Sequence, residues 1–189
     1  MKYEAIVAGV SSGGMNALNL LLPFLPEDFK IPLVIVQHIG PYSDGRWVEL
    51  LNTRCRLNVK EADEKERIKK GNIYVAPANY HLLIERDASF SLSIDPKVNY
   101  ARPSIDVLFE SAAAAYKNKL IGVVLTGSNN DGAAGMKKIQ DNGGLTIVQE
   151  PLTAQSPYMP ASVIEILTPD YVLPLEDIAP LLIKLDKQY

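Results

Sequence analysis

The chain alternates short apolar segments with amphipathic ones, a pattern typical of an α/β fold. Residues 5–10, 32–37, 72–76 and 120–125 form nearly continuous apolar runs that are rich in β-branched side chains. Such runs indicate strands that are covered on both faces, as in parallel sheets. Helical spacing of apolar residues follows several of them. The sequence therefore predicts a doubly wound α/β domain with a mostly parallel sheet and helices on both faces.

Two segments depart from this rhythm. Residues 81–85 and 89–94 flank the turn-forming residues 86–88, and together they predict a small antiparallel hairpin. Near the end of the chain, Pro180 lies inside a helical pattern that runs from about residue 175 to 185. Proline cannot donate a backbone hydrogen bond inside a helix, so we expect a kink or a late start there.

Composition places the chain among ordinary globular proteins, with 47% hydrophobic and 22% charged residues in 189. We expect residues 1–189 to form a single domain. The net charge of −3 gives no reason to expect nucleic acid or an anionic membrane as a partner. The single cysteine, Cys55, cannot form an internal disulfide, and no apolar run approaches the ~20 residues that cross a bilayer. With no signal-peptide pattern at its start, the sequence predicts a cytoplasmic protein without membrane insertion.

The turn after the first predicted strand is the first candidate site. Residues 9–14 read Gly-Val-Ser-Ser-Gly-Gly and fit the G-x-S-x-G pattern, in which a sharp strand-to-helix turn projects a serine hydroxyl, here that of Ser11. The same turn could instead cradle a phosphate with its backbone N–H groups. Neither the Walker nor the dinucleotide pattern is present. From this turn alone, a nucleophile and a phosphate site remain open alternatives.

Two further candidates are expected to meet Ser11 at one edge of the sheet. Ser11, His38 and Asp131 each follow the carboxyl end of a predicted strand, where parallel sheets bind their ligands. A histidine can take the proton of a serine, and a carboxylate can fix the histidine tautomer. We favour His38 over His81 as the base, because His81 opens the predicted hairpin. On its own, His38 fits equally well a histidine that is satisfied by backbone contacts at a strand end.

The carboxylate also has competing interpretations. Asp131 stands just before a predicted helix, where aspartate is a preferred N-cap, and the two roles need not exclude each other. Asp106 is the alternative carboxylate. It follows Ser104 at the predicted start of another helix, and that position explains it without catalysis.

Several motifs together resemble a known family. They are, in order, Gly9-Val10-Ser11-Ser12-Gly13-Gly14, Gln37-His38-Ile39, Arg102-Pro103-Ser104-Ile105-Asp106-Val107-Leu108-Phe109, Leu125-Thr126-Gly127 and Asp131-Gly132-Ala133-Ala134-Gly135-Met136. They resemble the catalytic domain of the chemotaxis protein-glutamate methylesterase family, CheB. Residues 59–62 and 159–160 also match, so the resemblance spans nearly the whole chain. The order serine, histidine, aspartate differs from that of the α/β-hydrolase family.

The resemblance implies an enzyme, a carboxylic ester hydrolase of chemotaxis signalling that uses no cofactor and no metal. It implies Ser11 as nucleophile, His38 as general base and then acid, and Asp131 as the orienting carboxylate. The substrate would be a methylated glutamate side chain on a cytoplasmic chemoreceptor helix or a similar methylated signalling protein. Methanol would be released, and some relatives also deamidate glutamine at the same kind of site.

Three further residues are assigned to substrate contacts. The backbone N–H of Ser12, at the start of a helix, is a natural donor to the oxyanion, and Ser128 is a candidate for the second donor. The resemblance places Arg102 in a loop that would contact receptor side chains or carboxylates; the alternative is a solvated surface arginine. Gly9, Gly13 and Gly14 would allow backbone and substrate to approach closely.

Two departures from the family pattern change the expectation. The family usually has Met-Gly after Thr-Gly, where this chain has Ser128-Asn129. The family also carries an N-terminal receiver domain, whereas the first catalytic strand here begins near Tyr3, so we expect a stand-alone enzyme. Two other functions stay open at this point. One is a catalytically weak module that binds receptors or a sensor-kinase system, and the other is a nucleotide-binding domain.

Overall fold

The protein, analysed as a computed structural model that describes residues 2–188, is built around a seven-stranded sheet. Its strands are β1 (Ala5–Val10), β2 (Leu33–Gln37), β3 (Asn58–Glu61), β4 (Asn72–Val75), β7 (Leu120–Val124), β8 (Leu145–Gln149) and β9 (Tyr171–Leu173). They lie in the order β3-β4-β2-β1-β7-β8-β9. Each pairing between neighbours is parallel. The predicted doubly wound fold is therefore confirmed.

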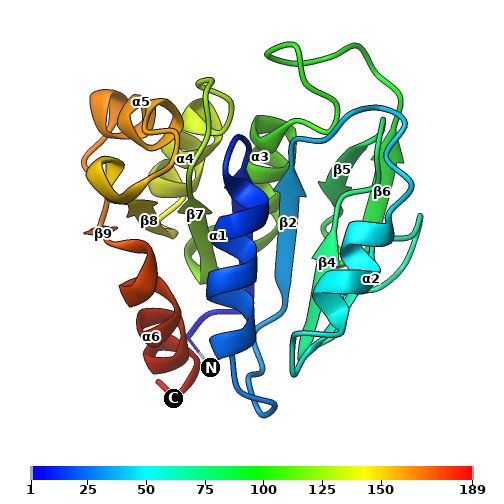
Figure 1. Cartoon of the computed structure of the whole chain (residues 1–189), viewed down its shortest axis with the longest axis horizontal. Helices are drawn as coiled ribbons and strands as arrows, with labels where there is room; N and C mark the ends of the chain where they lie inside the picture. The colour runs from blue at the N-terminus through cyan, green and yellow to red at the C-terminus, as the bar shows by residue number, and fades with distance from the viewer. Residues whose placement is uncertain (1, 189) are drawn as a thin grey trace.

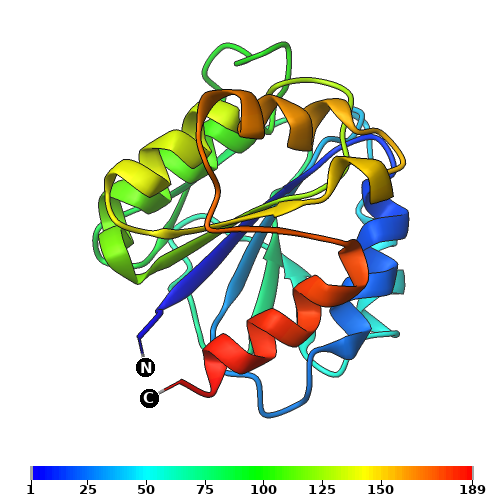
Figure 2. The same ribbon diagram turned by 90° about the vertical axis from the view of Figure 1, so that its left-hand side faces the viewer.

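Helices cover both faces of the sheet (Figure 1). They are α1 (Gly14–Leu21), α2 (Arg46–Asn52), α3 (Ile105–Tyr116), α4 (Ala133–Asp141), α5 (Tyr158–Ile166) and α6 (Leu175–Asp186), with short 3-10 turns η1 (Leu22–Phe24), η2 (Lys117–Lys119) and η3 (Pro151–Thr153). Figure 2 shows α1 and α6 on one side of the sheet and α3, α4 and α5 on the other. Between residues 2 and 188, no helix is both long enough and apolar enough to cross a bilayer.

The position of the central strand β1 between two cores explains why its sequence is apolar throughout. Ile6, Ala8 and Val10 belong to the core beneath α1, α2 and α6. Ala5 and Val7 point the other way, into the core with α3 and α4. Because successive side chains of a strand alternate between faces, a strand covered on both sides must be apolar at every position. All six residues of β1 are buried.

The predicted hairpin is also present. Strands β5 (His81–Ile84) and β6 (Phe90–Ser93) pair antiparallel and form a separate two-stranded sheet. The hairpin packs on α3, where the N–H of Ile84 donates to Oγ of Ser111 at 3.1 Å. The ring of Phe90 meets that of Tyr74 edge-on, with centroids 4.9 Å apart. These contacts fix the hairpin against α3 and beside β4 of the main sheet.

Helix α6 corrects one expectation. It begins at Leu175 and continues through Pro180, so of the kink or late start expected at that proline, the late start does not occur. Pro180 is exposed and costs the helix one backbone hydrogen bond. The same helix buries Ile178, Ala179 and Leu182 against α1 and the sheet, and this apolar face offsets the loss.

The chain reverses direction across the sheet next to β1. From β1 it moves through α1 to β2 on one side, whereas β7 lies on the other side and leads into α4 on the opposite face. Loops at such a reversal separate and leave a crevice at the carboxyl ends of the strands. Four loops reach this crevice, those after β1, β2, β6 and β7, and they carry the candidate residues Ser11, His38, Arg102 and Asp131.

Candidate active site

The turn after β1 positions Ser11. Its N–H donates to the carbonyl of Thr126 at 3.0 Å, and the side-chain amide of Gln37 donates to the carbonyl of Ser11 at 3.1 Å. Gly13 follows with φ of 81°, a left-handed conformation that glycine adopts without strain, and α1 begins at Gly14. The turn is thus held from both neighbouring strands, and the Ser11 hydroxyl faces the crevice.

Two of the glycines in this turn are needed for packing within the protein. A Cβ on Gly9 would collide with Ile105 of α3, and one on Gly14 would collide with the side chain of Gln37. Both glycines therefore let elements of the protein approach one another. The approach of substrate expected at Gly9, Gly13 and Gly14 stays a prediction beside this packing role.

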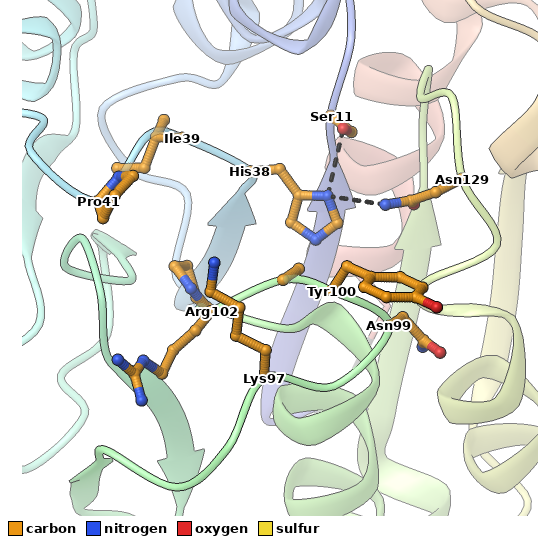
Figure 3. A pocket seen from close by; sticks show the side chains of 11 residues that line it. Ser11, His38, Ile39, Pro41, Lys97, Asn99, Tyr100, Arg102 and Asn129 are labelled. Carbon is orange, nitrogen blue, oxygen red and sulfur yellow. Dashed lines mark hydrogen bonds between the residues drawn. The ribbon is translucent and has the colours of Figure 1, made fainter.

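His38 bridges the serine and the aspartate. Its Nδ1 lies 3.2 Å from Oγ of Ser11, a contact drawn in Figure 3, and its Nε2 lies 2.8 Å from Oδ2 of Asp131. The backbone is fixed as well, because the N–H of His38 donates to the carbonyl of Val10 at 3.0 Å. Gln37 donates to the carbonyl of His38 at 2.9 Å in addition to that of Ser11. One amide therefore ties together the backbones of both residues.

Asp131 is completely buried and is surrounded by donors. Oδ2 accepts from Nε2 of His38 and from the N–H of Ile105 at 2.7 Å. Burial alone would raise the pKa of this carboxyl, but the hydrogen bonds from His38, Ile105 and Asn99 outweigh it and hold the pKa below its usual value. Asp131 is thus an anion at neutral pH, which assigns the proton of the neutral imidazole to Nε2 and leaves Nδ1 free to accept from Ser11.

The other oxygen of Asp131 serves the fold. Oδ1 accepts from Oγ of Ser104 at 2.9 Å and from the N–H of Asp106 at 3.1 Å. Together with the N–H of Ile105, these donors form the start of α3, so Asp131 caps α3. The expected cap of α4 by Asp131 is wrong, because the loop turns its side chain away from α4 toward the neighbouring helix. The hydroxyl of Ser104 likewise bonds to Asp131 and makes no cap bond within α3.

Asp106 caps α4 in return. Its Oδ1 accepts from the N–H groups of Gly132 at 3.0 Å and Gly135 at 2.7 Å. Asn99 joins the two carboxylates, since its amide donates to Oδ2 of Asp106 at 2.8 Å and to Oδ1 of Asp131 at 3.1 Å. Burial and the charge of Asp131 raise the pKa of Asp106 to about 6. The two helices that flank the crevice are therefore locked by reciprocal caps.

This raised pKa predicts a pH-dependent stability. Asp106 binds its proton more tightly in the folded protein, at a pKa of about 6, than in the unfolded chain, near 3.8. Its contribution to the free energy of unfolding therefore falls as pH rises from about 4 to above 6. In Asp106→Asn, which keeps an oxygen for the two glycine N–H groups, this term is absent. The free energy of unfolding of the variant minus that of the wild type should rise by roughly 2 kcal/mol across this window.

Urea denaturation of both proteins at pH 4, 5, 6 and 7 measures this difference. Asp28→Asn is the matched control, because Asp28 is an exposed carboxylate and its loss changes the net charge equally. A difference between Asp106→Asn and the wild type that stays flat, or shrinks with rising pH, contradicts the prediction.

Ser12 and Ser128 lie together at the mouth of the turn. Their hydroxyls are 2.9 Å apart, and the hydroxyl of Thr126 donates to the carbonyl of Ser12 at 2.8 Å. Within residues 2–188, no hydrogen bond is found for the N–H of Ser12. This N–H is therefore available to a ligand beside Ser11. Both serine hydroxyls are directed to each other and are exposed to solvent.

Arg102 lines the crevice, but its guanidinium bonds within the protein. It donates to Oδ1 of Asn79 at 2.8 and 3.2 Å, and to the carbonyls of Ile94 and Asp95 at 2.6 and 3.0 Å. These contacts hold the loop after the hairpin. His81 is buried and bonded on both ring nitrogens, to the N–H of Ser104 and the carbonyl of Pro96. It supports the same region from behind the crevice.

The crevice has a volume of about 280 Å³. Ser11, His38 and Arg102 of its lining were predicted as site residues from the sequence, whereas the polar residues Lys97, Asn99, Tyr100 and Asn129 were not. Its lining consists of Ser11, His38, Ile39, Pro41, Lys97, Asn99, Tyr100, Ala101, Arg102, Pro103 and Asn129. The missed polar residues lie in irregular loops, where no periodicity marks them. Within residues 2–188, no group of three or more histidine, cysteine and acidic side chains is arranged to hold a metal ion.

The series of Ser11, His38 and an ionised Asp131 has the same order of hydrogen-bonded partners that serine hydrolases use for acyl transfer, with the ring nitrogens exchanged: Nδ1 faces the serine and Nε2 the aspartate. Fold and site together define a hydrolase built on a parallel α/β sheet. The sequence model of the CheB methylesterase family matches residues 6–182, and the chain belongs to that family.

Known relatives agree with this assignment. A protein of Leptospira interrogans, named provisionally for protein-glutamate methylesterase and protein-glutamine glutaminase activity, is 61% identical over 99% of this chain and 97% of its own length. The protein-glutamate methylesterase/protein-glutamine glutaminase of Archaeoglobus fulgidus is 39% identical over 94% of this chain, which spans only 52% of that relative. The crystal structure of the Thermotoga maritima CheB methylesterase catalytic domain superposes with a TM-score of 0.93 at 37% identity, covering 98% of this chain and 100% of that one.

Proposed function

We propose that the protein hydrolyses methyl esters of glutamate side chains on methylated chemoreceptors through Ser11, His38 and Asp131, and that it works in chemotaxis signalling. The hydrogen bonds that join these three side chains at the crevice carry this proposal. Membership of the CheB methylesterase family supports the substrate class. A chemoreceptor presents its methylated residues on cytoplasmic helices, so the proposal also places the protein in the cytoplasm.

In the first half of the reaction, the Ser11 hydroxyl attacks the carbonyl carbon of the ester. Its proton passes to Nδ1 of His38, while the π electrons of the carbonyl move to oxygen. Asp131 stabilises the imidazolium through Nε2 and holds the ring in place. The oxyanion would be met by the N–H of Ser12 and by the hydroxyl of Ser128.

The intermediate then collapses. The carbonyl re-forms, the bond to the methoxy oxygen breaks, and that oxygen takes the proton from Nδ1 of His38 and leaves as methanol. Water repeats the sequence on the acyl-enzyme, with His38 again taking a proton, and releases glutamate and free Ser11. The same attack on a glutamine side chain would release ammonia. Metal or cofactor is not part of this proposal.

Arg102 would act on the substrate indirectly. Its guanidinium holds the carbonyls of Ile94 and Asp95, and it thereby shapes the wall of the crevice against which a receptor helix would lie. An N–H group of this guanidinium that makes no hydrogen bond within the protein would donate to acidic side chains of the receptor.

Methanol release tests the function. Incubation with a peptide that carries glutamate γ-methyl ester should yield one methanol for each new carboxylate. The matched control is the same peptide with unmodified glutamate, which should yield none. Binding of the ester peptide without any methanol would overturn the enzyme proposal and favour a binding module.

A further inference from the structure

Asn129 lies beside the base, in the loop after β7. Its Oδ1 accepts from the N–H of Asp131 at 3.2 Å, which fixes the orientation of the amide. The NH2 group is therefore the end that faces His38, with Nδ2 3.4 Å from Nδ1. Figure 3 shows the contacts from Ser11 and Asn129 meeting at this one ring nitrogen. The lone pair that accepts the serine proton thus has an amide donor next to it.

The position of the Asn129 amide beside Nδ1 of His38 determines which protein group lies next to the leaving group. A leaving group can take its proton from Nδ1 of His38 only if its own reacting atom lies within about 3 Å of that nitrogen. An atom placed there is also next to the NH2 group of Asn129. The other amide in the crevice, that of Asn99, already donates to Asp106 and Asp131. Asn129 is therefore the side-chain amide that is placed to contact the leaving group.

We propose that Asn129 is a specificity-determining residue, which makes the site prefer a leaving group that accepts a hydrogen bond over one that carries N–H groups. The inference rests on the proposed function and concerns its substrate choice. It states that the methyl ester of glutamate is preferred to the carboxamide of glutamine, and that the N–H donors of Asn129 produce a large part of that preference.

The two leaving groups differ in their lone pairs. The methoxy oxygen of the tetrahedral intermediate has two, so one can take the proton of His38 as the C–O bond breaks while the other accepts from Asn129. The nitrogen of the corresponding glutamine intermediate has one lone pair, and protonation by His38 uses it as the C–N bond breaks and ammonia leaves. Its N–H groups then face the N–H groups of Asn129, an arrangement of donor against donor that leaves polar hydrogens unpaired.

The experiment compares two substrates on each enzyme. Peptides of one sequence carry either glutamate γ-methyl ester or glutamine, and kcat/KM is measured from methanol or ammonia release. In Asn129→Ala the ratio of ester to amide turnover should fall about tenfold, the effect of roughly one hydrogen bond. Asn129→Asp, which puts an acceptor where the donor stood, should lower the ratio further. An effect of either change on the base that is equal for both substrates divides out of this ratio.

A matched control lies next in the chain. Asn130 is exposed in the same loop, and no side-chain hydrogen bond of it is found within residues 2–188, so Asn130→Ala should leave the ratio unchanged. A glutamate γ-thiomethyl ester provides a third substrate in case glutamine turnover is too slow to measure. Sulfur is a weak acceptor, so Asn129→Ala should reduce turnover of the oxygen ester about tenfold relative to the thioester.

The outcomes separate this inference from the function on which it rests. A wild type that releases no methanol disproves the proposed function. A wild type that hydrolyses the ester, with a ratio unaffected by Asn129→Ala, overturns the specificity role alone. Equal losses on all substrates also overturn it and would make Asn129 a residue that only positions His38 and Asp131. Thermal unfolding midpoints of the variants identify any loss that comes from misfolding.

Discussion

Replacing Ser11 with alanine should lower kcat for methyl-ester hydrolysis by a factor on the order of 10⁶, because within residues 2–188 Ser11 carries the one hydroxyl found hydrogen-bonded to His38. The nearest hydroxyl in the turn, that of Ser12, is directed to Ser128. The hydroxyl of Ser11 makes its hydrogen bond to His38, and the backbone bonds that hold the turn involve other atoms. The variant should therefore fold normally and still bind the ester peptide.

Methanol release under saturating ester peptide measures this effect, and a thermal unfolding curve checks the fold. Ser91→Ala is the matched control, because Ser91 lies on β6 in the hairpin, outside the lining of the crevice. Ser11→Ala with more than about one hundredth of the wild-type rate would contradict a serine mechanism. A trapped acyl-enzyme on Ser11, seen as a mass increase of the wild type after acid quenching, would support it directly.

The architecture was predictable because it depends on local pattern. The apolar run of residues 5–10 has no polar face, and a strand with no polar face must lie inside a sheet covered on both sides. The carboxyl ends of such strands meet at one edge, so the sequence alone predicts that Ser11, His38 and Asp131 lie close together. The geometry adds that the serine contacts Nδ1 and the aspartate contacts Nε2 of the imidazole, and this choice depends on ring orientation.

The supporting contacts could not be predicted in the same way. Asp131 was expected to cap the helix that follows it, the usual local arrangement, whereas it caps α3 while Asp106 caps α4. An exchange of caps between two helices depends on their packing, which sequence separation hides. Asn99 joins the two carboxylates from an irregular loop, where no pattern marks it. The role of Gln37 could have been detected from the sequence. It is a polar residue at the end of an apolar strand, it is buried, and buried polar groups need hydrogen-bond partners.

The exchange of caps has a consequence for function. The carboxylate that orients the base also begins α3, and its neighbour begins α4, so the geometry of the site is part of the packing of the two helices. A change at Asp131 should therefore affect activity and stability together, unlike a change at Ser11.

Asp131→Asn should lower kcat about 10⁴-fold and destabilise the protein by about 1–3 kcal/mol. An amide offers one acceptor end where the carboxylate offers two. With its NH2 group toward His38, it favours the wrong imidazole tautomer and leaves the N–H of Ile105 unpaired. With its NH2 group the other way, the N–H of Asp106 loses its acceptor. Either orientation leaves a buried backbone donor unsatisfied.

The pH dependence of the stability lost in Asp131→Asn distinguishes removal of the carboxylate charge from a general packing defect. The pKa of Asp131 is depressed in the folded protein, so the carboxylate contributes stability above its unfolded pKa, near 3.8, and this contribution disappears as pH falls through the lower folded value. The deficit of Asp131→Asn relative to the wild type should therefore be full at pH 7 and shrink in acid below about pH 4. Denaturant unfolding at pH 3 and pH 7 measures it, with Asp28→Asn again as the control for lost charge. A deficit equal at both pH values would mean that the carboxylate's charge does not hold the start of α3, and normal turnover by the folded variant would remove Asp131 from the catalytic series.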